Sequence, residues 1–376
     1  MKRLTILLAM ILAIIVGCAL QGRIGEVDEG PLGLPPVAVP ADNPQSPQKV
    51  ALGKSLFEDR RFSADGKVAC ATCHDPDNAF DTEDRVSEGV NKLKGTRNAP
   101  TIINSAYYEA QFRDGRRPSL EEQAKDPFLN PVEHGLTSHE QILEVIRNHS
   151  SYRAQFRSVF GIEPQDLTID HVAKAIACFE RTVVSGNSPF DLYFYAGNTS
   201  TVTNAAIRGF EIFRTKGRCQ ECHPVGQKHA TFTDSKFHNL GVGLKNIEPR
   251  LMQIADDFRR KKQEGKDIDK IVLTDKEISE LGRFVVTLRT EDIGSFRTPS
   301  LRNVEVTSPY MHDGSIQTLE EVVEFLNKGG GSNPYLDHGI GPLNLTYPEQ
   351  ADLVAFLRTL TSPQFSQARF FKPRSW

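Results

Sequence analysis

Apolar residues recur at helical spacing in two distant stretches of the chain. The positions concerned are Val172, Ile176, Phe179, Leu353, Phe356, Leu357 and Leu360. Spacing of three and four residues places such side chains on one face of a helix, so each stretch is predicted to be an amphipathic helix. Alternation of apolar and polar residues, which is typical of strands, occurs only in a few short stretches. The chain is therefore predicted to be mainly α.

The two helices close two similar halves of the chain. The first half contains Gly53-x-x-x-Phe57 and then Cys70-x-x-Cys73-His74, and the second contains Gly209-x-x-x-Phe213 and then Cys219-x-x-Cys222-His223. This internal repeat predicts two domains, at residues 49–190 and 191–376. Their long loops need an organising group to fold compactly. The charge-rich segment 250–276 is predicted to be a surface helix or a mobile insertion of the second half.

The N-terminus has the pattern of an export signal. Lys2 and Arg3 precede an apolar run over residues 4–16, which is short for a bilayer span. The run ends in Ile15-Val16-Gly17-Cys18, which resembles a bacterial lipobox. We expect residues 1–18 to be a lipoprotein signal with a lipidated Cys18, and the alternative is a short uncleaved anchor. Ala19 favours the outer membrane, so the protein is expected to be lipid-anchored in the periplasm, with residues 19–48 as a flexible tether.

Composition and cysteine usage narrow the function classes. The chain has 39% hydrophobic and 25% charged residues and a net charge of -3, which is ordinary globular composition without a basic stripe for nucleic acid. Of the 6 cysteines, four belong to the two Cys-x-x-Cys-His units. Cys178 lies in an apolar helical run and is expected to be a buried, inert thiol. We expect no disulfide framework.

The two Cys-x-x-Cys-His units predict covalently attached c-type haem. In such a unit both thiols add to the vinyl groups of the porphyrin, and the adjacent histidine ligates the iron from one face. The predicted attachment and ligand residues are Cys70, Cys73, His74, Cys219, Cys222 and His223. The alternatives are a zinc site, which needs four ligands, and a thiol redox pair, which needs neither histidine. Attachment of c-type haem outside the cytoplasm agrees with the export signal.

A series of motifs around these units resembles one known family, the bacterial di-haem cytochrome c peroxidases and their MauG-like relatives. The resemblance covers residues 47–362. Its motifs include Gly95-Thr96-Arg97-Asn98-Ala99-Pro100-Thr101, Asp114-Gly115-Arg116, Glu122-Gln123-Ala124, Asn130-Pro131-Val132-Glu133, Phe237-His238-Asn239-Leu240-Gly241, Thr298-Pro299-Ser300-Leu301-Arg302-Asn303-Val304 and Pro309-Tyr310-Met311-His312-Asp313-Gly314. The resemblance implies two cytochrome c-like helical domains, each enclosing one haem. The N-terminal haem is then the peroxide site, and the C-terminal haem transfers electrons.

The resemblance also assigns residues around the N-terminal haem. Its distal pocket holds Gln123, Pro127 and Glu133. A carboxyl group held above the iron can move a proton between the two peroxide oxygens, and an apolar pocket raises its pKa toward the working pH. Some relatives block this face with a histidine, whose position here is Val90. Valine cannot ligate iron, so we expect an open face without reductive activation.

A calcium site between the domains is a further implication of the resemblance. It is formed by Asn98 and the backbone of Thr307 and Pro309. Oxygen ligands of this kind suit a hard cation.

Two positions depart from the family. A tryptophan that relays charge between the haems is replaced by Arg113, and the only tryptophan here is Trp376. Arginine cannot be oxidised, but it can bind haem propionates. The methionine or tyrosine that ligates the C-terminal iron is replaced by Leu326. Met311, Tyr335 and His338 are candidate substitutes, although Met311 and His312 belong to a motif that is structural in relatives.

Three functions remain open from the sequence. The first is reduction of hydrogen peroxide, with electrons from a small periplasmic cytochrome c or copper protein. The second is a MauG-like oxidase that uses peroxide to modify a partner protein; Leu326 favours this function and Arg113 weakens it. The third is a non-catalytic electron carrier, against which an open face beside Glu133 argues.

Overall fold

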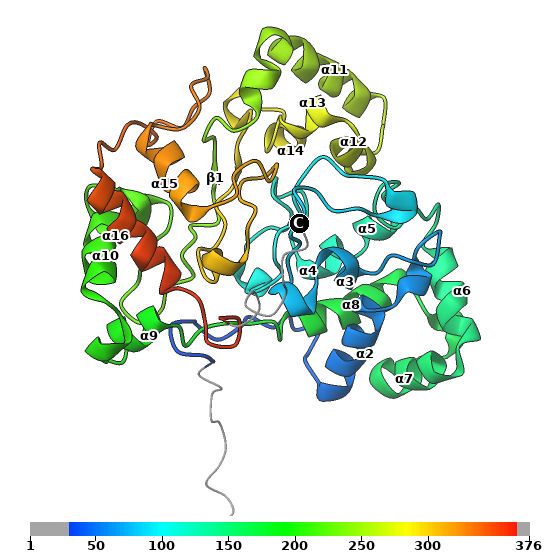
Figure 1. Cartoon of the computed structure of the whole chain (residues 1–376). Coiled ribbons are helices and arrows are strands. Elements are labelled where there is room, and N and C mark those ends of the chain that lie inside the picture. The colour runs from blue at the N-terminus through cyan, green and yellow to red at the C-terminus, as the bar shows by residue number, and fades with distance from the viewer. Residues whose placement is uncertain (1–29, 367–376) are drawn as a thin grey trace, which may run out of the picture. The chain divides into compact units, whose positions relative to one another are not determined.

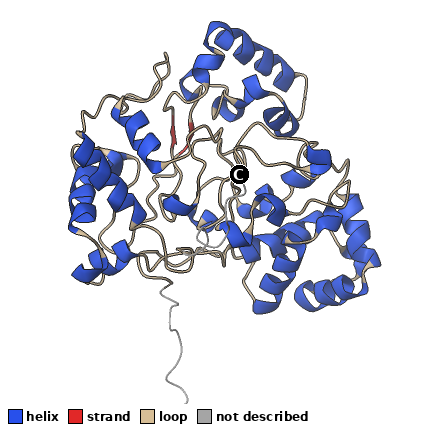
Figure 2. Cartoon of the chain, viewed as in Figure 1, coloured by secondary structure: helices blue, strands red, loops and turns tan. Residues whose placement is uncertain are grey.

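The computed structural model describes residues 30–366, and this region is mainly helical, as predicted (Figures 1 and 2). Its α-helices are α2 Pro47–Phe57, α3 Cys70–Cys73, α4 Leu120–Gln123, α5 Asp126–Leu129, α6 Glu140–Asn148, α7 Ser150–Phe160, α8 Ile169–Glu180, α9 Pro189–Phe194, α10 Asn204–Arg214, α11 Leu251–Gln263, α12 Ile268–Thr274, α13 Lys276–Ser279, α14 Phe284–Thr287, α15 Leu319–Asn327 and α16 Tyr347–Arg358. Two short strands, β1 Phe237–His238 and β2 Phe296–Arg297, pair antiparallel. None of the helices described is long and apolar enough to cross a membrane.

The two predicted closing helices, α8 and α16, each pack against an earlier helix of the same half. Helix α2 lies against α8, and α10 lies against α16 (Figure 1). A Cβ atom at Gly53 would come within 1.9 Å of the Ala175 carbonyl, and one at Gly209 within 1.9 Å of the Asp352 carbonyl. The repeated glycines thus allow each pair of helix backbones to approach closely.

Apolar side chains gather in three clusters. One lies around α2, α6, α7 and α8, and a second lies around α9, α10, α15 and α16. A third belongs to residues 244–293, where Ile254, Phe258 and Phe284 are buried. The charge-rich segment is therefore more than a surface helix: α11 and α12 bury one face in a core of their own and turn their charges outward. Cys178 is fully buried in α8, as expected.

Residues 31–46 differ from the predicted flexible tether. Asn43 is fully buried, and its side-chain amide donates to Glu121 and to the Lys174 carbonyl. The Gly33 carbonyl accepts from Arg302 at 2.6 Å. The Gly and Pro content suggested a flexible tether, but partners far along the chain satisfy the polar groups of this segment and hold it in place. Cys18 lies outside the described residues.

Candidate functional site

The first Cys-x-x-Cys-His unit lies at the edge of a large cavity. Helix α3 forms a single turn from Cys70 to Cys73, and the N–H of His74 donates to the Cys70 carbonyl at 3.0 Å. This turn brings both thiols and the imidazole to one side of the cavity, which measures about 1330 Å³ with its opening to solvent included. Burial lowers the pKa of His74 to about 4, so the imidazole is neutral and can ligate a metal.

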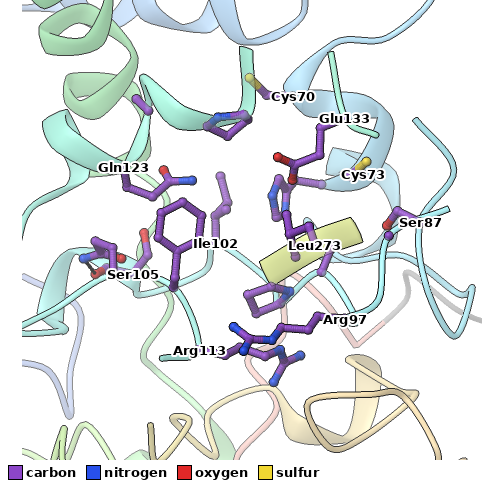
Figure 3. A pocket seen from close by; sticks show the side chains of 18 of the residues that line it. Cys70, Cys73, Ser87, Arg97, Ile102, Ser105, Arg113, Gln123, Glu133 and Leu273 are labelled. Atoms are coloured by element: carbon purple, nitrogen blue, oxygen red, sulfur yellow. Dashed lines mark hydrogen bonds between the residues drawn. The ribbon is translucent and has the colours of Figure 1, made fainter. Parts of the chain in front are cut away.

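The three predicted distal residues line the same cavity. Gln123 ends α4, Pro127 lies in α5, and Glu133 lies in the turn that follows α5. Figure 3 shows the side chains of Gln123 and Glu133 reaching into the cavity from opposite sides. The structure therefore brings together the predicted attachment residues and the predicted distal residues, which lie about 50 to 60 positions apart in the sequence.

Glu133 has the electrostatic setting of a proton carrier. Burial raises its pKa to about 7, and the charges of Asp126 and Asp269 raise it further, whereas Arg116 lowers it. Such a carboxyl group can exchange a proton at neutral pH. Val90 is buried close to it, and its N–H donates to the Glu133 carbonyl at 2.8 Å. The valine side chain offers no atom that could ligate iron.

The cavity wall contains buried arginines that could bind the two anionic propionates of a haem. Arg113 and Arg297 both line the cavity, and burial lowers the pKa of each guanidinium. Among the described residues, Nη1 of Arg297 is buried without a hydrogen-bond partner. An anionic group beside these guanidiniums would complete their interactions. Together with the thiols and the neutral His74, they fit a covalently attached haem.

The second unit also fits a haem. Cys219 begins the 3-10 turn Cys219–Glu221, and the backbone then turns to His223. Nδ1 of His223 donates to the Phe232 carbonyl at 2.8 Å, which leaves Nε2 as the nitrogen for a metal. Burial lowers the pKa of this imidazole to about 4.

The candidate distal ligands of the second unit lie in different settings. Leu326 is half-buried in α15 and has no lone pair to offer. Tyr335 donates its hydroxyl to Sδ of Met252 at 3.4 Å, and His338 is exposed. Next to Met311, the ring of His312 stacks on Phe296 at 3.8 Å between ring centroids. Its Nε2 also contacts Glu280 at 2.7 Å, which agrees with a structural role for that motif.

Arg113 places a positive charge beside Asn98, one of the residues predicted to bind calcium. It donates from Nε to the Asn98 carbonyl at 2.9 Å and from Nη2 to Oδ1 of Asn98 at 2.5 Å. This guanidinium would repel a cation at the same point. The calcium site formed by Asn98 with the backbone of Thr307 and Pro309 stays a prediction.

Sequence reasoning missed an ionic network beside the cavity. Asp114 is fully buried and accepts from Arg97 and Arg116, while Asp269 of α12 accepts from Arg116 and Arg117 at 2.5 Å each. The charged residues at positions 114–117 were the only sign of this network in the sequence. Nothing in them indicated that Arg117 would pair with Asp269, 152 residues away.

Sequence reasoning also missed Leu273 and Glu180 as cavity residues, and it left Tyr107, Tyr108 and Phe112 near Arg113 without an assigned role. Leu273 of α12, which belongs to the second half, lines the cavity near Glu133 (Figure 3). Tyr108 lines it from the first half. Glu180 lines it from α8 with a buried Oε2 that has no partner among the described residues, and burial raises its pKa to about 8.

The chain is similar to several known proteins. The sequence model of the family described as di-haem cytochrome c peroxidase matches residues 47–200. Cytochrome-c peroxidase IdrP1 of Denitromonas iodatirespirans is 39% identical over 361 residues, covering 93% of this chain and 92% of that protein. Methylamine utilization protein MauG of Methylorubrum extorquens is 35% identical and covers 85% and 80%. A solved MauG-like protein associated with microbial copper homeostasis is 31% identical, with a TM-score of 0.73 over 91% of this chain and 99% of that one.

Proposed function

We propose a function from the premise that this chain belongs to the di-haem cytochrome c peroxidase family. In this proposal it reduces hydrogen peroxide at the haem site of His74. The electrons pass through the haem site of His223. The chain is a peroxidase-type oxidoreductase, and its family implies haem c cofactors. In this proposal Cys70 and Cys73 hold one haem and Cys219 and Cys222 hold the other.

One observation carries the proposal: a buried carboxyl group with a pKa of about 7 shares a cavity with a neutral histidine next to two cysteines. The haem supplies the iron that binds the oxidant and the electrons that split the O–O bond. Glu133 takes a proton from one oxygen of hydrogen peroxide and gives it to the oxygen that leaves as water. The Gln123 amide orients the oxidant by hydrogen bonding. Pro127 and Leu273 add apolar surface that limits water.

The test compares the wild-type holoprotein with Glu133→Gln in rapid mixing with hydrogen peroxide. The glutamine has the same size but cannot accept the proton, so we expect the peroxide reaction to slow by about 10²-fold or more. Glu121→Gln is the matched control, since Glu121 lies on α4 outside the cavity lining. Equal rates for Glu133→Gln and wild type would remove Glu133 from the mechanism.

The second candidate is a MauG-like oxidase, favoured by the non-ligating Leu326 and by the MauG relatives. Steady turnover with a reduced small cytochrome c or copper protein supports the peroxidase. Negligible turnover together with a long-lived oxidised state after peroxide addition supports the oxidase, whose substrate is a partner protein.

We also propose a periplasmic location with a lipid anchor at Cys18. Ala19, which follows this cysteine, favours the outer membrane. The test is metabolic labelling with a radioactive fatty acid. We expect label in the wild-type protein and none in Cys18→Ser, and an unlabelled wild-type protein would contradict the anchor.

A further inference from the structure

The two haem sites need an electron route, and Arg113 stands where the family has its tryptophan. Tyr108 is the aromatic side chain that joins the first site to the second half. Its ring lines the cavity of His74, and its hydroxyl oxygen accepts from the N–H of Ser300 at 2.9 Å. These two residues are separated by 192 positions, so this contact links the two halves directly.

The connection continues from Ser300 to the second haem site. The Ser300 hydroxyl donates to the Thr231 carbonyl at 2.7 Å. Thr231 is bonded to Phe232, whose carbonyl accepts from Nδ1 of His223 at 2.8 Å. Hydrogen bonds and covalent bonds therefore run without a gap from the cavity of His74 to the imidazole of His223.

We propose that Tyr108 carries electrons between the two haem sites through this chain of Ser300, Thr231, Phe232 and His223. The inference rests on the proposed function. One electron leaves the His223 site and one electron arrives at the His74 site. The phenol keeps its proton and returns to its starting charge, so no protein group on the route is oxidised or reduced overall.

The surroundings of Tyr108 favour electron transfer through its side chain without formation of an oxidised tyrosine. The Arg297 guanidinium stacks on its ring with 3.2 Å between the guanidinium carbon and the ring centroid. A cation on the ring face opposes a second positive charge on the same ring. The electron is therefore expected to pass through the side chain without resting there.

The neighbouring tyrosine provides a matched control. Tyr107 is half-buried like Tyr108, but its hydroxyl donates to the Pro35 carbonyl and it does not line the cavity of His74. Tyr107→Phe thus removes a hydroxyl of the same kind next to the proposed route. Tyr108→Phe removes the acceptor for Ser300 and keeps the ring.

The experiment is flash reduction of the oxidised holoprotein without peroxide, followed by absorbance changes that separate the two haems. We expect electron exchange between the haems to slow several-fold in Tyr108→Phe and in Ser300→Ala, and to stay at the wild-type rate in Tyr107→Phe. Because the two bonds lie in series, the double variant is expected to be no slower than the slower single variant. Redox titration of each variant checks that the haem potentials are unchanged.

A wild-type exchange rate in Tyr108→Phe would overturn the route, as would an equal loss in Tyr107→Phe or the absence of exchange in the wild type. These outcomes differ from failure of the proposed function, which would appear as a lack of peroxide turnover in wild-type protein with normal exchange between the haems.

Discussion

At the scale of single residues, the chemistry of Glu133 depends on its burial. The pKa of this carboxyl group is about 7 in the fold against an ordinary value of 4.5. It is protonated at pH 5 and ionised at pH 8, and only the ionised form accepts a proton from peroxide. We therefore expect the rate constant of the peroxide reaction to rise from pH 5 to pH 8 with a midpoint near pH 7. Stopped-flow measurements at constant ionic strength check this, and a flat profile would contradict it.

Arg113 leads to a prediction about calcium. Its guanidinium donates to both Asn98 oxygens and places a positive charge beside a predicted calcium ligand. We expect purified protein to contain no stoichiometric calcium by elemental analysis, and a chelator to leave the melting temperature and the activity unchanged. Arg113→Ala removes the internal cation, and its melting temperature should fall. One calcium per chain, lost together with activity on chelation, would show that the guanidinium does not replace the ion.

At the scale of elements, Asp269 makes several of the contacts that hold helix α12 against the first half. Asp269 accepts from Arg116 and Arg117, and its carbonyl accepts from Asn130 at 3.0 Å. Asp269→Asn leaves buried guanidinium groups short of an acceptor, so the free energy of unfolding should drop by about 1–3 kcal/mol. Hydrogen exchange in residues 268–274 should also increase. Asp257→Asn is the control, because its pair with Arg260 is largely exposed and should contribute about 0–1 kcal/mol.

The same helix shows where prediction from sequence ends. Local patterns predicted the paired helices and the two haem units, because spacing carries that information. The set of Gln123, Pro127 and Glu133 came from the family resemblance. The role of Asp269 could not be predicted, since charge density indicates exposure but not a partner in the other half. The burial of Asn43 could not be predicted for the same reason. A polar residue in a Pro-rich stretch gives no sign that Glu121 will accept a hydrogen bond from its side-chain amide.

At the scale of the whole molecule, one buried ion pair ties several segments together. Arg302 and Asp191 are fully buried and form two contacts of 2.8 and 2.9 Å, and Arg302 also donates to the carbonyls of Gly33 and Ala230.

Removal of one partner leaves a buried charge without compensation. Arg302→Met should lower the free energy of unfolding by about 3–5 kcal/mol. Arg208→Met should lower it by about 0–1 kcal/mol, because its pair with Asp352 lies at the surface. Urea unfolding of both variants tests the contrast, and equal losses would contradict it.

Leu273 and Arg297 belong to the second half of the chain but line a cavity built mainly by the first. A gene fragment ending near residue 190 would encode every predicted attachment and proton-transfer residue of that cavity and still leave one wall missing. In a chimera between two homologues joined at that point, the donor of the C-terminal half would therefore also contribute part of the lining of this cavity.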